Sequence, residues 1–411
     1  MVGLIPSEHW EYRVGDIMHG MAAALSPRGK SFMLHIPEIG DCIPARSARS
    51  AMVAALKALD LPSGARIGVP LYCCPVVFKA IREAGCTARF IDVDYSTYCM
   101  SPEDLSAKGA QVDAIMAVHM FGNLCDMAKL KEAAEGKPII EDCAQALGSK
   151  YDGRMAGMHG TIAAFSFRSG KYLSVGEGGA LYSGDADIRA RLSQFVSAMP
   201  EPDRTEECLH VATTYIRSVL RRRPLYGPLG YRIWSTYNKN TDFTAKSPIV
   251  MCQSYHSDLA IAKKRIPLLD SAIDRQRYHA DYYSRSLRLN RGMLCTEKPG
   301  TFYNRYLYPI TFPAPEQRDF IANYLFKNRI GAIMPYRDIV DIAATYYGYQ
   351  GDCPVAEQVS RRILVIPSNY SLKNEEIQRI AQCVNEGWEK IANHGRDDEL
   401  CCDTAGDAVA G

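Results

Sequence analysis

The sequence lacks any run of about eighteen apolar residues, the length that a helix needs to cross a membrane. Its first residues, MVGLIPSEHWEYRVGD, contain acidic side chains and no apolar core of the kind found in secretory signals. The formal net charge is only +2 over 411 residues, which gives no reason to expect binding to nucleic acid or to a membrane surface. These absences predict a cytoplasmic protein.

Metal-binding spacings are absent as well. The fourteen cysteines are scattered, with no CxxC pair and no histidine–cysteine cluster at zinc spacing. Cys73-Cys74 and Cys401-Cys402 are adjacent pairs, a spacing that does not suit a metal ion. In a chain of this size without an export signal, we expect reduced and mostly buried thiols, and no metal site.

Strands and helices alternate from residue 43 onwards. The apolar segments ARIGVPLY, TARFIDVD, VDAIMAVHMFG and PIIEDCAQ predict strands, and the segments between them predict helices. This alternation predicts an α/β fold with a mostly parallel central sheet and helices on both faces. Ligands of such sheets bind at the carboxyl ends of the strands, where Tyr72, His119 and Asp142 fall.

The chain is long enough for two domains with sizeable cores. We predict an N-terminal segment over 1–40, a large domain over 41–247 and a smaller C-terminal α/β domain over 248–395. Within the large domain, residues 197–247 form a variable helical insertion rich in arginine, tyrosine and proline. In the smaller domain, TFYNRYLYPITFP is predicted as one strand. The polar tail over 396–411 is predicted to be disordered.

One stretch combines an acid and a lysine in a pattern that suggests a specific chemistry. Asp142 closes an apolar strand, and Lys171 follows in a loop rich in glycine and serine. A neutral lysine can form an imine with an aldehyde cofactor, while a carboxylate keeps the ring nitrogen of that cofactor protonated. Taken singly, each residue has a commoner explanation, a surface lysine and a helix N-cap.

A phosphate-bearing cofactor would also need an anion site. Arg49 and Ser50 stand at the start of a predicted helix, where free backbone N–H groups bind anions. Ser166, five residues before Lys171, offers a hydroxyl group. Serines near loops are common, so these residues support the hypothesis only in combination.

Four further residues fall near the same strand ends. Gln145 could reach a ring hydroxyl or belong to a capping box. Tyr72 could stack on a flat ring or pack at a strand end. His119 could line the site or bridge hydrogen bonds. Glu177 lies in the sequence Gly-Glu-Gly-Gly that follows the lysine.

The order of these motifs resembles the DegT/DnrJ/StrS family of aminotransferases, which depend on pyridoxal phosphate (PLP) and aminate keto sugars on nucleotide carriers. The similar blocks are SARSAM, VPLYCCP, AVHMFG, EDCAQALG, FSFRSGKYLSVGEGG and PVAEQVSRRILVIPSN. The resemblance extends over roughly residues 40–390. It implies the fold-type-I architecture, with a large PLP-binding domain and a smaller C-terminal domain.

The resemblance implies a role for each candidate residue. Lys171 would form the imine and move the proton, and Asp142 would pair with the pyridine nitrogen. Ser166 and the backbone of Arg49 and Ser50 would bind the phosphate, and Gln145 would contact the ring hydroxyl. Tyr72 would stack on the ring, and His119 and Glu177 would contact the substrate.

The chain departs from the family pattern at three places. Ala48 and Arg49 stand where the family usually has glycine and threonine, and Cys74 stands where a ring-stacking aromatic is frequent. The family's asparagine that reaches across from a partner subunit has no clear match in SPIVMCQSYHSD.

The resemblance implies a homodimer with shared active sites that takes an amino group from glutamate or glutamine. By the family's default the acceptor would be a nucleotide-linked keto sugar, and a cyclitol, a free keto acid and a natural-product ketone are the alternatives. A PLP-dependent dehydratase of this family carries histidine at the lysine position, so Lys171 disfavours that alternative. A desulfurase or other lyase, and a regulator that only binds PLP, remain as further alternatives.

Overall fold

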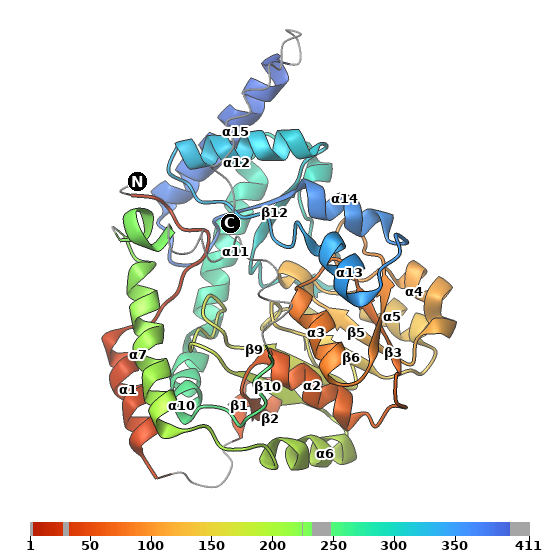
Figure 1. Cartoon of the computed structure of the whole chain (residues 1–411). Coiled ribbons are helices and arrows are strands. Elements are labelled where there is room, and N and C mark those ends of the chain that lie inside the picture. The colour runs from red at the N-terminus through yellow and green to blue at the C-terminus, as the bar shows by residue number, and fades with distance from the viewer. Residues whose placement is uncertain (1–2, 28–32, 224, 232–247, 395–411) are drawn as a thin grey trace.

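The computed structural model describes residues 3–27, 33–223, 225–231 and 248–394. The predicted tail over 396–411 and the end of the predicted insertion, 232–247, therefore lie outside the described residues. At the centre is an eight-stranded sheet in the order β1-β2-β10-β9-β6-β5-β3-β4 (Figure 1). Its strands are β1 (Leu34–Ile36), β2 (Gly40–Ala45), β3 (Arg66–Pro70), β4 (Thr87–Ile91), β5 (Ala114–Val118), β6 (Ile139–Asp142), β9 (Ile162–Ser166) and β10 (Gly179–Tyr182).

The sheet is mostly parallel, as the alternating pattern predicted. Strands β4, β3, β5, β6 and β9 run parallel, whereas β10, β2 and β1 are antiparallel to their neighbours. The register pairs Val118 with Asp142 and Asp142 with Ala164. The carboxyl ends of β5, β6 and β9 therefore meet at one edge of the sheet.

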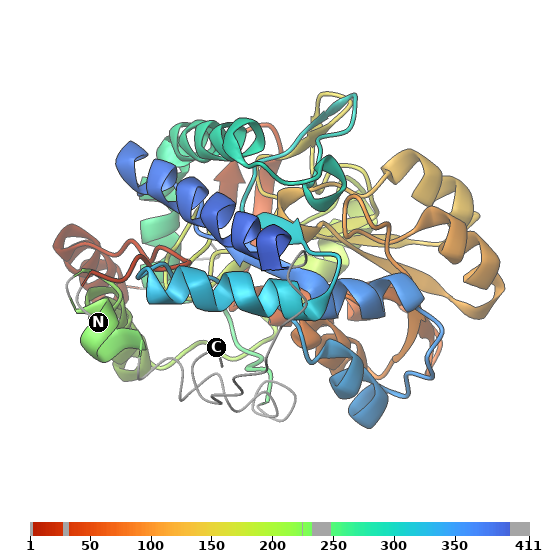
Figure 2. The same cartoon turned by 90° about the horizontal axis from the view of Figure 1, so that it is seen from above.

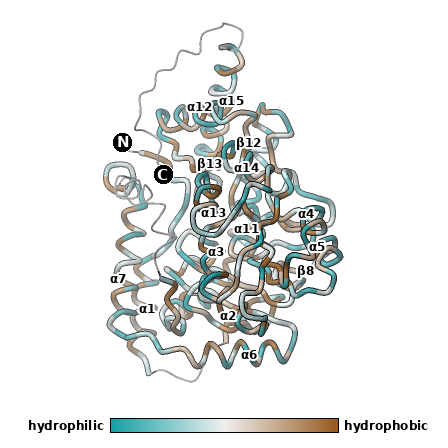
Figure 3. The backbone as a smooth tube through the Cα atoms, turned by 45° about the vertical axis from the view of Figure 1, so that its right-hand side comes forward, coloured by the Kyte–Doolittle hydropathy of each residue, from teal (hydrophilic) through white to brown (hydrophobic). Residues whose placement is uncertain are grey.

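Helices cover this sheet with apolar faces, which arise because apolar residues recur at helical spacing in the sequence. The covering helices include α2 (Ala48–Ala58), α3 (Pro75–Glu83), α4 (Pro102–Lys108), α5 (Met127–Ala134) and α6 (Ala186–Ser197). In α6 the buried residues Ile188, Leu192 and Val196 recur every four positions, which gives one apolar face. Along α6 the tube accordingly alternates between hydrophilic and hydrophobic colours (Figure 3).

A second group of helices lies beside the sheet. Helix α1 (Val14–Leu25) contacts α7 (Arg204–Leu220) and α10 (His256–Arg265), and α11 (Leu269–Ser286) continues the chain. Near the start of α11, Ile273 packs in the same apolar cluster as strands β9 and β10. Further along α11, Tyr283 packs with the smaller sheet. The chain thus passes between the two cores along α11, and the domain boundary at residue 248 stays a prediction.

The smaller core is built on a two-stranded antiparallel sheet of β12 (Tyr308–Thr311) and β13 (Ile363–Ile366). Helices α12 (Pro315–Lys327) and α15 (Asn374–His394) lie side by side over it (Figure 2). Helices α13 (Ile339–Tyr347) and α14 (Pro354–Arg362) follow in the chain, and their buried residues, among them Ile339 and Val359, pack in the apolar cluster of the large sheet. Among the described residues, no helix combines the length and the apolar character that a membrane crossing requires.

The prediction of one strand over TFYNRYLYPITFP is wrong. Its first residues form β11 (Thr301–Phe302), which joins β7 (Lys150–Tyr151) and β8 (Arg154–Met155) in a separate sheet, and its last residues form β12. Between the two strands the Asn304 amide donates to the carbonyls of Gln145 and Leu147, at 3.0 and 2.9 Å. Arg305 follows with a φ of 58°. These side-chain hydrogen bonds divert the backbone from the extended path that the alternating pattern predicted.

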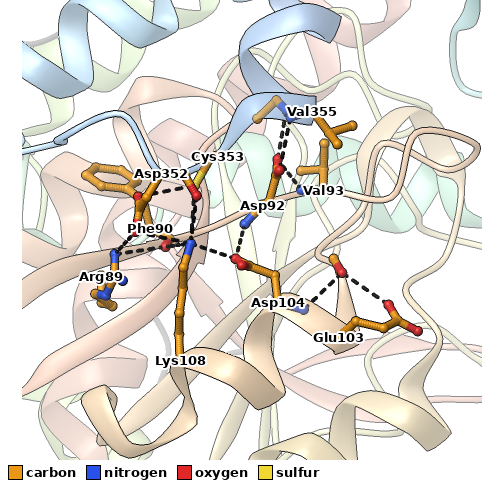
Figure 4. Close-up of polar contacts among 12 residues, drawn as sticks. Arg89, Phe90, Asp92, Val93, Glu103, Asp104, Lys108, Asp352, Cys353 and Val355 are labelled. Atoms are coloured by element: carbon orange, nitrogen blue, oxygen red, sulfur yellow. Dashed lines mark hydrogen bonds and ion pairs between the residues drawn. The ribbon is translucent and has the colours of Figure 1, made fainter.

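A cluster of polar contacts joins the large sheet to helix α14 (Figure 4). The Asp92 carboxylate accepts the N–H groups of Val355 and Ala356, at 3.0 and 2.8 Å, at the first turn of α14. Close by, Lys108 forms ion pairs with Asp104 at 2.8 Å and Asp352 at 3.2 Å. A residue that follows β4 therefore caps a helix more than two hundred and fifty positions later in the chain.

We predict that Asp92→Ala lowers the free energy of unfolding by about 2–4 kcal/mol, since it leaves two N–H groups at the start of α14 without their acceptor. Urea denaturation measures the loss. The matched control is Asp185→Ala, because the exposed Asp185 caps α6 by accepting the N–H groups of Asp187 and Ile188 within a single element. The control variant should lower the free energy of unfolding by about 1 kcal/mol. Equal losses of unfolding free energy for the two variants would contradict a cap that also holds α14 against the large sheet.

Candidate active site

The candidate residues come together at the carboxyl edge of the parallel strands. Asp142 ends β6, and Ser166 ends β9. Ser166 pairs with Gly179 of β10, and the neighbouring Gly178 pairs with Ser47 at the start of α2. The anion-binding helix start and the strand ends are thereby neighbours in space.

Asp142 is a buried carboxylate, 4% exposed. Its Oδ1 atom accepts the N–H of Ala144 at 2.9 Å. Burial raises the pKa of Asp142 above its ordinary value, while this N–H and the charge of Lys171 act in the opposite direction. A cation placed beside Asp142 would keep the carboxylate ionised.

Lys171 is half-buried at the junction of two cavities. Its Nζ atom lies 4.3 Å from the centre of the Tyr306 ring. Burial, followed by the positive charge of Arg168, lowers the pKa of Lys171 from its ordinary 10.5 to about 7, against the opposing charges of Asp142 and Glu8. Near neutral pH a large share of this amine is therefore unprotonated and nucleophilic.

One of these cavities brings three of the predicted residues together. Gln145, Ser166 and Lys171 all line it. The amide of Gln145 is oriented because its Oε1 accepts the N–H of Phe121 at 2.9 Å, and its Nε2 donates to the Tyr336 hydroxyl at 3.3 Å. A donor group is therefore held near the lysine.

The N-terminus of α2 offers the backbone donors of an anion site. Ser47 caps the helix and accepts the N–H of Ser50 at 3.2 Å, so that N–H already has a protein partner. The N–H groups of Ala48 and Arg49 precede it in the first turn, which has no intrahelical acceptors. Gly179 allows this close packing, since a Cβ there would lie 2.8 Å from the nitrogen of Ala48. The assignment of Arg49, Ser50 and Ser166 to a phosphate stays a prediction.

Glu177 forms ion pairs with two arginines, a contact that the sequence motifs did not predict. Its carboxylate pairs with Arg46 and lies 3.2 Å from Nη2 of Arg49. The guanidinium group of Arg46 stacks on Tyr255, 3.9 Å from the ring centre. The N–H of Glu177 donates to Asp258 at 3.3 Å. The predicted substrate contact of Glu177 stays a prediction, and it would compete with these ion pairs.

Tyr72 and His119 are fully enclosed. The hydroxyl of Tyr72 donates to the carbonyl of Pro335 at 2.9 Å, and its ring packs edge-on against Tyr336. The Nδ1 atom of His119 accepts the N–H of Cys125 at 3.2 Å, so the proton is on Nε2, which lies 3.0 Å from Glu141. Ring stacking by Tyr72 and substrate contact by His119 stay predictions.

His119 and Glu141, together with Cys143, also place potential ligand atoms close enough to surround a metal ion. Both carboxylate oxygens of Glu141 are already used, because they accept the N–H groups of Gly157 at 2.8 Å and His159 at 2.7 Å in addition to the histidine. The cluster is therefore built as a hydrogen-bond network that supports β6.

Three residues at the site carried no recognised motif. Tyr306 comes from the loop between β11 and β12, which was predicted as part of a strand. Its N–H donates to Oδ1 of Asn304, which holds this loop out of the sheet. Tyr336 comes from the segment before α13. Glu8 lines the larger cavity from the N-terminal segment. The aromatic residues Tyr306 and Tyr336 could be found in advance only by predicting the loops that hold them.

The charges of the site match the groups of PLP. The buried Asp142 would pair with a protonated ring nitrogen, the weakly basic Lys171 with an aldehyde, and the start of α2 with a phosphate. A doubly charged anion and a ring cation fit these positions better than an uncharged ligand does. The residues present therefore fit this cofactor.

A mostly parallel sheet with a weakly basic lysine and a buried acid at its carboxyl edge suits an α/β enzyme that uses a lysine nucleophile. A family model, described as the DegT/DnrJ/EryC1/StrS aminotransferase family, matches residues 36–213 and 256–385. The chain belongs to this family, and it is an aminotransferase.

Individual relatives agree with this assignment. The chain is 28% identical to GDP-perosamine synthase from Escherichia coli O157:H7 over 81% of each chain. It is 35% identical to L-glutamine:2-deoxy-scyllo-inosose aminotransferase from Streptomyces fradiae, over 37% of this chain and 36% of that one. The PMP form of the putative sugar aminotransferase Spr1654 from Streptococcus pneumoniae superposes with a TM-score of 0.72 at 17% identity, covering 94% and 100% of the two chains. This last likeness confirms the predicted fold class.

We predict that the attachment of pyridoxal phosphate to the apoprotein depends on pH with a midpoint near 7. The neutral amine of Lys171 is the reactive form, so the rate should rise about tenfold per pH unit below this midpoint and level off above it. Stopped-flow absorbance after mixing with the cofactor measures the rate. A midpoint near 10, as for an exposed lysine, would contradict the lowered pKa.

Proposed function

We propose that this aminotransferase uses pyridoxal phosphate to move an amino group from glutamine or glutamate to the keto group of a sugar. The observation that carries the proposal is the joint placement of a weakly basic Lys171 and a buried Asp142 at one sheet edge, beside a helix N-terminus. The family supports the amino transfer, and the relative that makes GDP-perosamine supports a nucleotide-linked keto sugar.

When bound, the cofactor supplies an aldehyde that captures the amino group and a ring that withdraws electrons. The Nζ atom of Lys171, once released from the cofactor, would take the proton from the α carbon of the donor. It would then give this proton to the cofactor carbon. Asp142 would hold the proton on the ring nitrogen, which preserves the electron withdrawal. The N–H groups of Ala48 and Arg49, with the hydroxyl of Ser166, would hold the phosphate.

A cyclitol ketone is the second candidate acceptor. It is favoured by the relative from Streptomyces fradiae, which shares 35% identity over 154 residues and takes its amino group from glutamine. Both candidates are ketones that carry several hydroxyl groups. A panel of nucleotide-linked keto sugars and inososes, offered to the amine-loaded enzyme, separates them.

We include a homodimer in the proposal. Val14 and Met18 on α1, and Leu209 and Ile216 on α7, are each more than half exposed, and the two helices are in contact. Exposed apolar side chains at helical spacing on adjacent helices support contact with a second copy of the chain.

We predict that Lys171→Ala abolishes the visible absorption band of the enzyme-bound cofactor, because the variant has no amine with which to form the imine. Absorption spectra of the purified proteins measure the band. The matched control is Lys129→Ala, since the side chain of Lys129 is 61% exposed, and this variant should keep the band. A colourless wild-type protein that does not bind pyridoxal phosphate would refute the proposal.

We predict that Asp142→Asn keeps the visible band but slows the conversion of that band by glutamine about 100- to 1,000-fold. The amide has the same size but cannot hold the positive charge of the ring nitrogen. Rapid-mixing spectroscopy with glutamine and with glutamate measures the rate and also identifies the donor. Asp126→Asn serves as the control, because Asp126 caps α5 and asparagine caps equally well. An unchanged rate in Asp142→Asn would remove Asp142 from the mechanism.

A further inference from the structure

The N-terminal segment lines the larger cavity and contacts both cores. Ile5 pairs with the small core, where its N–H donates to the carbonyl of Arg329 at 2.9 Å and its carbonyl accepts the N–H of Gly331 at 2.8 Å. A few residues later, the carbonyl of Trp10 accepts the hydroxyl of Ser218 on α7 at 2.8 Å. Residues 7–9, between these two anchors, line the larger cavity together with Lys171.

The segment touches the turn that carries the lysine. Gly170 has a φ of +92°, and a Cβ there would lie 3.1 Å from Nε1 of Trp10 and 3.3 Å from Oε2 of Glu8. Only glycine permits both this backbone conformation and this approach. Glu8 is therefore held against the residue that precedes Lys171.

Glu8 lines the larger cavity with a carboxylate that is held in place by its neighbours. Its Oε2 atom accepts the indole N–H of Trp10 at 3.4 Å and lies 3.5 Å from Nη1 of Arg221. Burial alone would raise the pKa of Glu8, but Arg221 and Arg168 lower it below the ordinary value, so the carboxylate is charged at neutral pH. The indole and guanidinium groups thus both engage Oε2 of this carboxylate.

Asn369 lines the same cavity from the small core and offers a complementary group. Its Oδ1 atom accepts the N–H and the hydroxyl of Ser371, at 3.2 and 2.7 Å. Its Nδ2 atom is buried and finds no acceptor among the described residues. A charged carboxylate and an amide donor without an acceptor thus belong to residues that line one cavity.

We propose that Glu8 and Asn369 bind hydroxyl groups of the keto substrate, which is a polyhydroxylated ketone seated above Lys171. A hydroxyl group is both donor and acceptor, so it can donate to the carboxylate of Glu8 and accept from Nδ2 of Asn369. A carboxylate at Glu8 repels the second carboxylate of a keto acid but accepts a hydroxyl proton. The assignment rests on the proposed function and adds to it the residues that select the acceptor.

The test converts the enzyme to its amine-loaded form with glutamine or glutamate and follows its reaction with ketones by rapid-mixing spectroscopy. The probes are scyllo-inosose and a GDP-linked 4-keto sugar, which carry hydroxyl groups, and 2-oxoglutarate, which carries none. Glu8→Gln should raise the half-saturating concentration of the better polyhydroxylated probe by about 10- to 100-fold. With 2-oxoglutarate the variant should lose no affinity and should gain some, because the substitution removes the repulsion between the two carboxylates.

Two variants separate binding from a structural role. Glu8→Asp retains the charge and should recover part of the lost affinity. Asn369→Asp keeps the Oδ1 contact to Ser371 but replaces the donor with an acceptor, so it should weaken binding of scyllo-inosose. Its added charge should weaken binding of 2-oxoglutarate as well, so uncharged scyllo-inosose is the probe that tests this variant. Glu11→Gln is the matched control, since Glu11 lies on the same segment, contacts Tyr370 at 3.2 Å and does not line the cavity.

The outcomes are distinct. The assignment would be overturned if Glu8→Gln lost affinity equally for all probes. It would also be overturned if the affinity for the hydroxylated probes did not change. A wild type that accepts 2-oxoglutarate but neither hydroxylated probe would also overturn it, while amino transfer itself stands. A wild type that gives no amine-loaded form would overturn the proposed function instead.

Discussion

The site depends on one electrostatic balance, that between the amine of Lys171 and the charges around it. Burial and Arg168 favour the neutral amine, whereas Asp142 and Glu8 favour the cation. The result is a pKa of about 7, at which the lysine can act both as a nucleophile and as a proton carrier. A shift of either acid towards the lysine, or of Arg168 away from it, would raise the pKa of Lys171 towards its ordinary value.

This balance is assembled from parts of the chain that are far apart. The parallel register brings Asp142 to the same edge as Ser166, and the packing of Gly179 against α2 brings the helix N-terminus beside them. Asn304 bends the loop that places Tyr306 below the amine. The N-terminal segment then lines the larger cavity while it contacts both cores, and Asp92 ties α14 to the sheet. Loss of any of these connections would alter the surroundings of the lysine without a change in its sequence motif.

The prediction succeeded where local pattern and spacing are informative. Alternating strands and helices predicted the mostly parallel sheet, because each strand is a short apolar run between turn residues. The lysine and aspartate motifs predicted the edge where the candidate residues now lie. The strand prediction over TFYNRYLYPITFP failed because the side chain of Asn304 bonds to carbonyls 157 and 159 positions earlier in the chain. Glu8 was missed for the same kind of reason, since its role arises from Arg221 and Gly170, and nothing in its own neighbourhood marks it.

The sequence alone determined the family, the order of the sheet elements along the chain and the residues that suit the cofactor, because these depend on motifs and on short-range periodicity. Only the tertiary structure decided that Lys171 is weakly basic, that Glu177 is already paired with Arg46 and Arg49, and that Glu8 and Asn369 line one cavity with the lysine. Burial, charge balance and hydrogen-bond satisfaction are properties of the surroundings of a residue. Those surroundings exist only after distant segments have packed together.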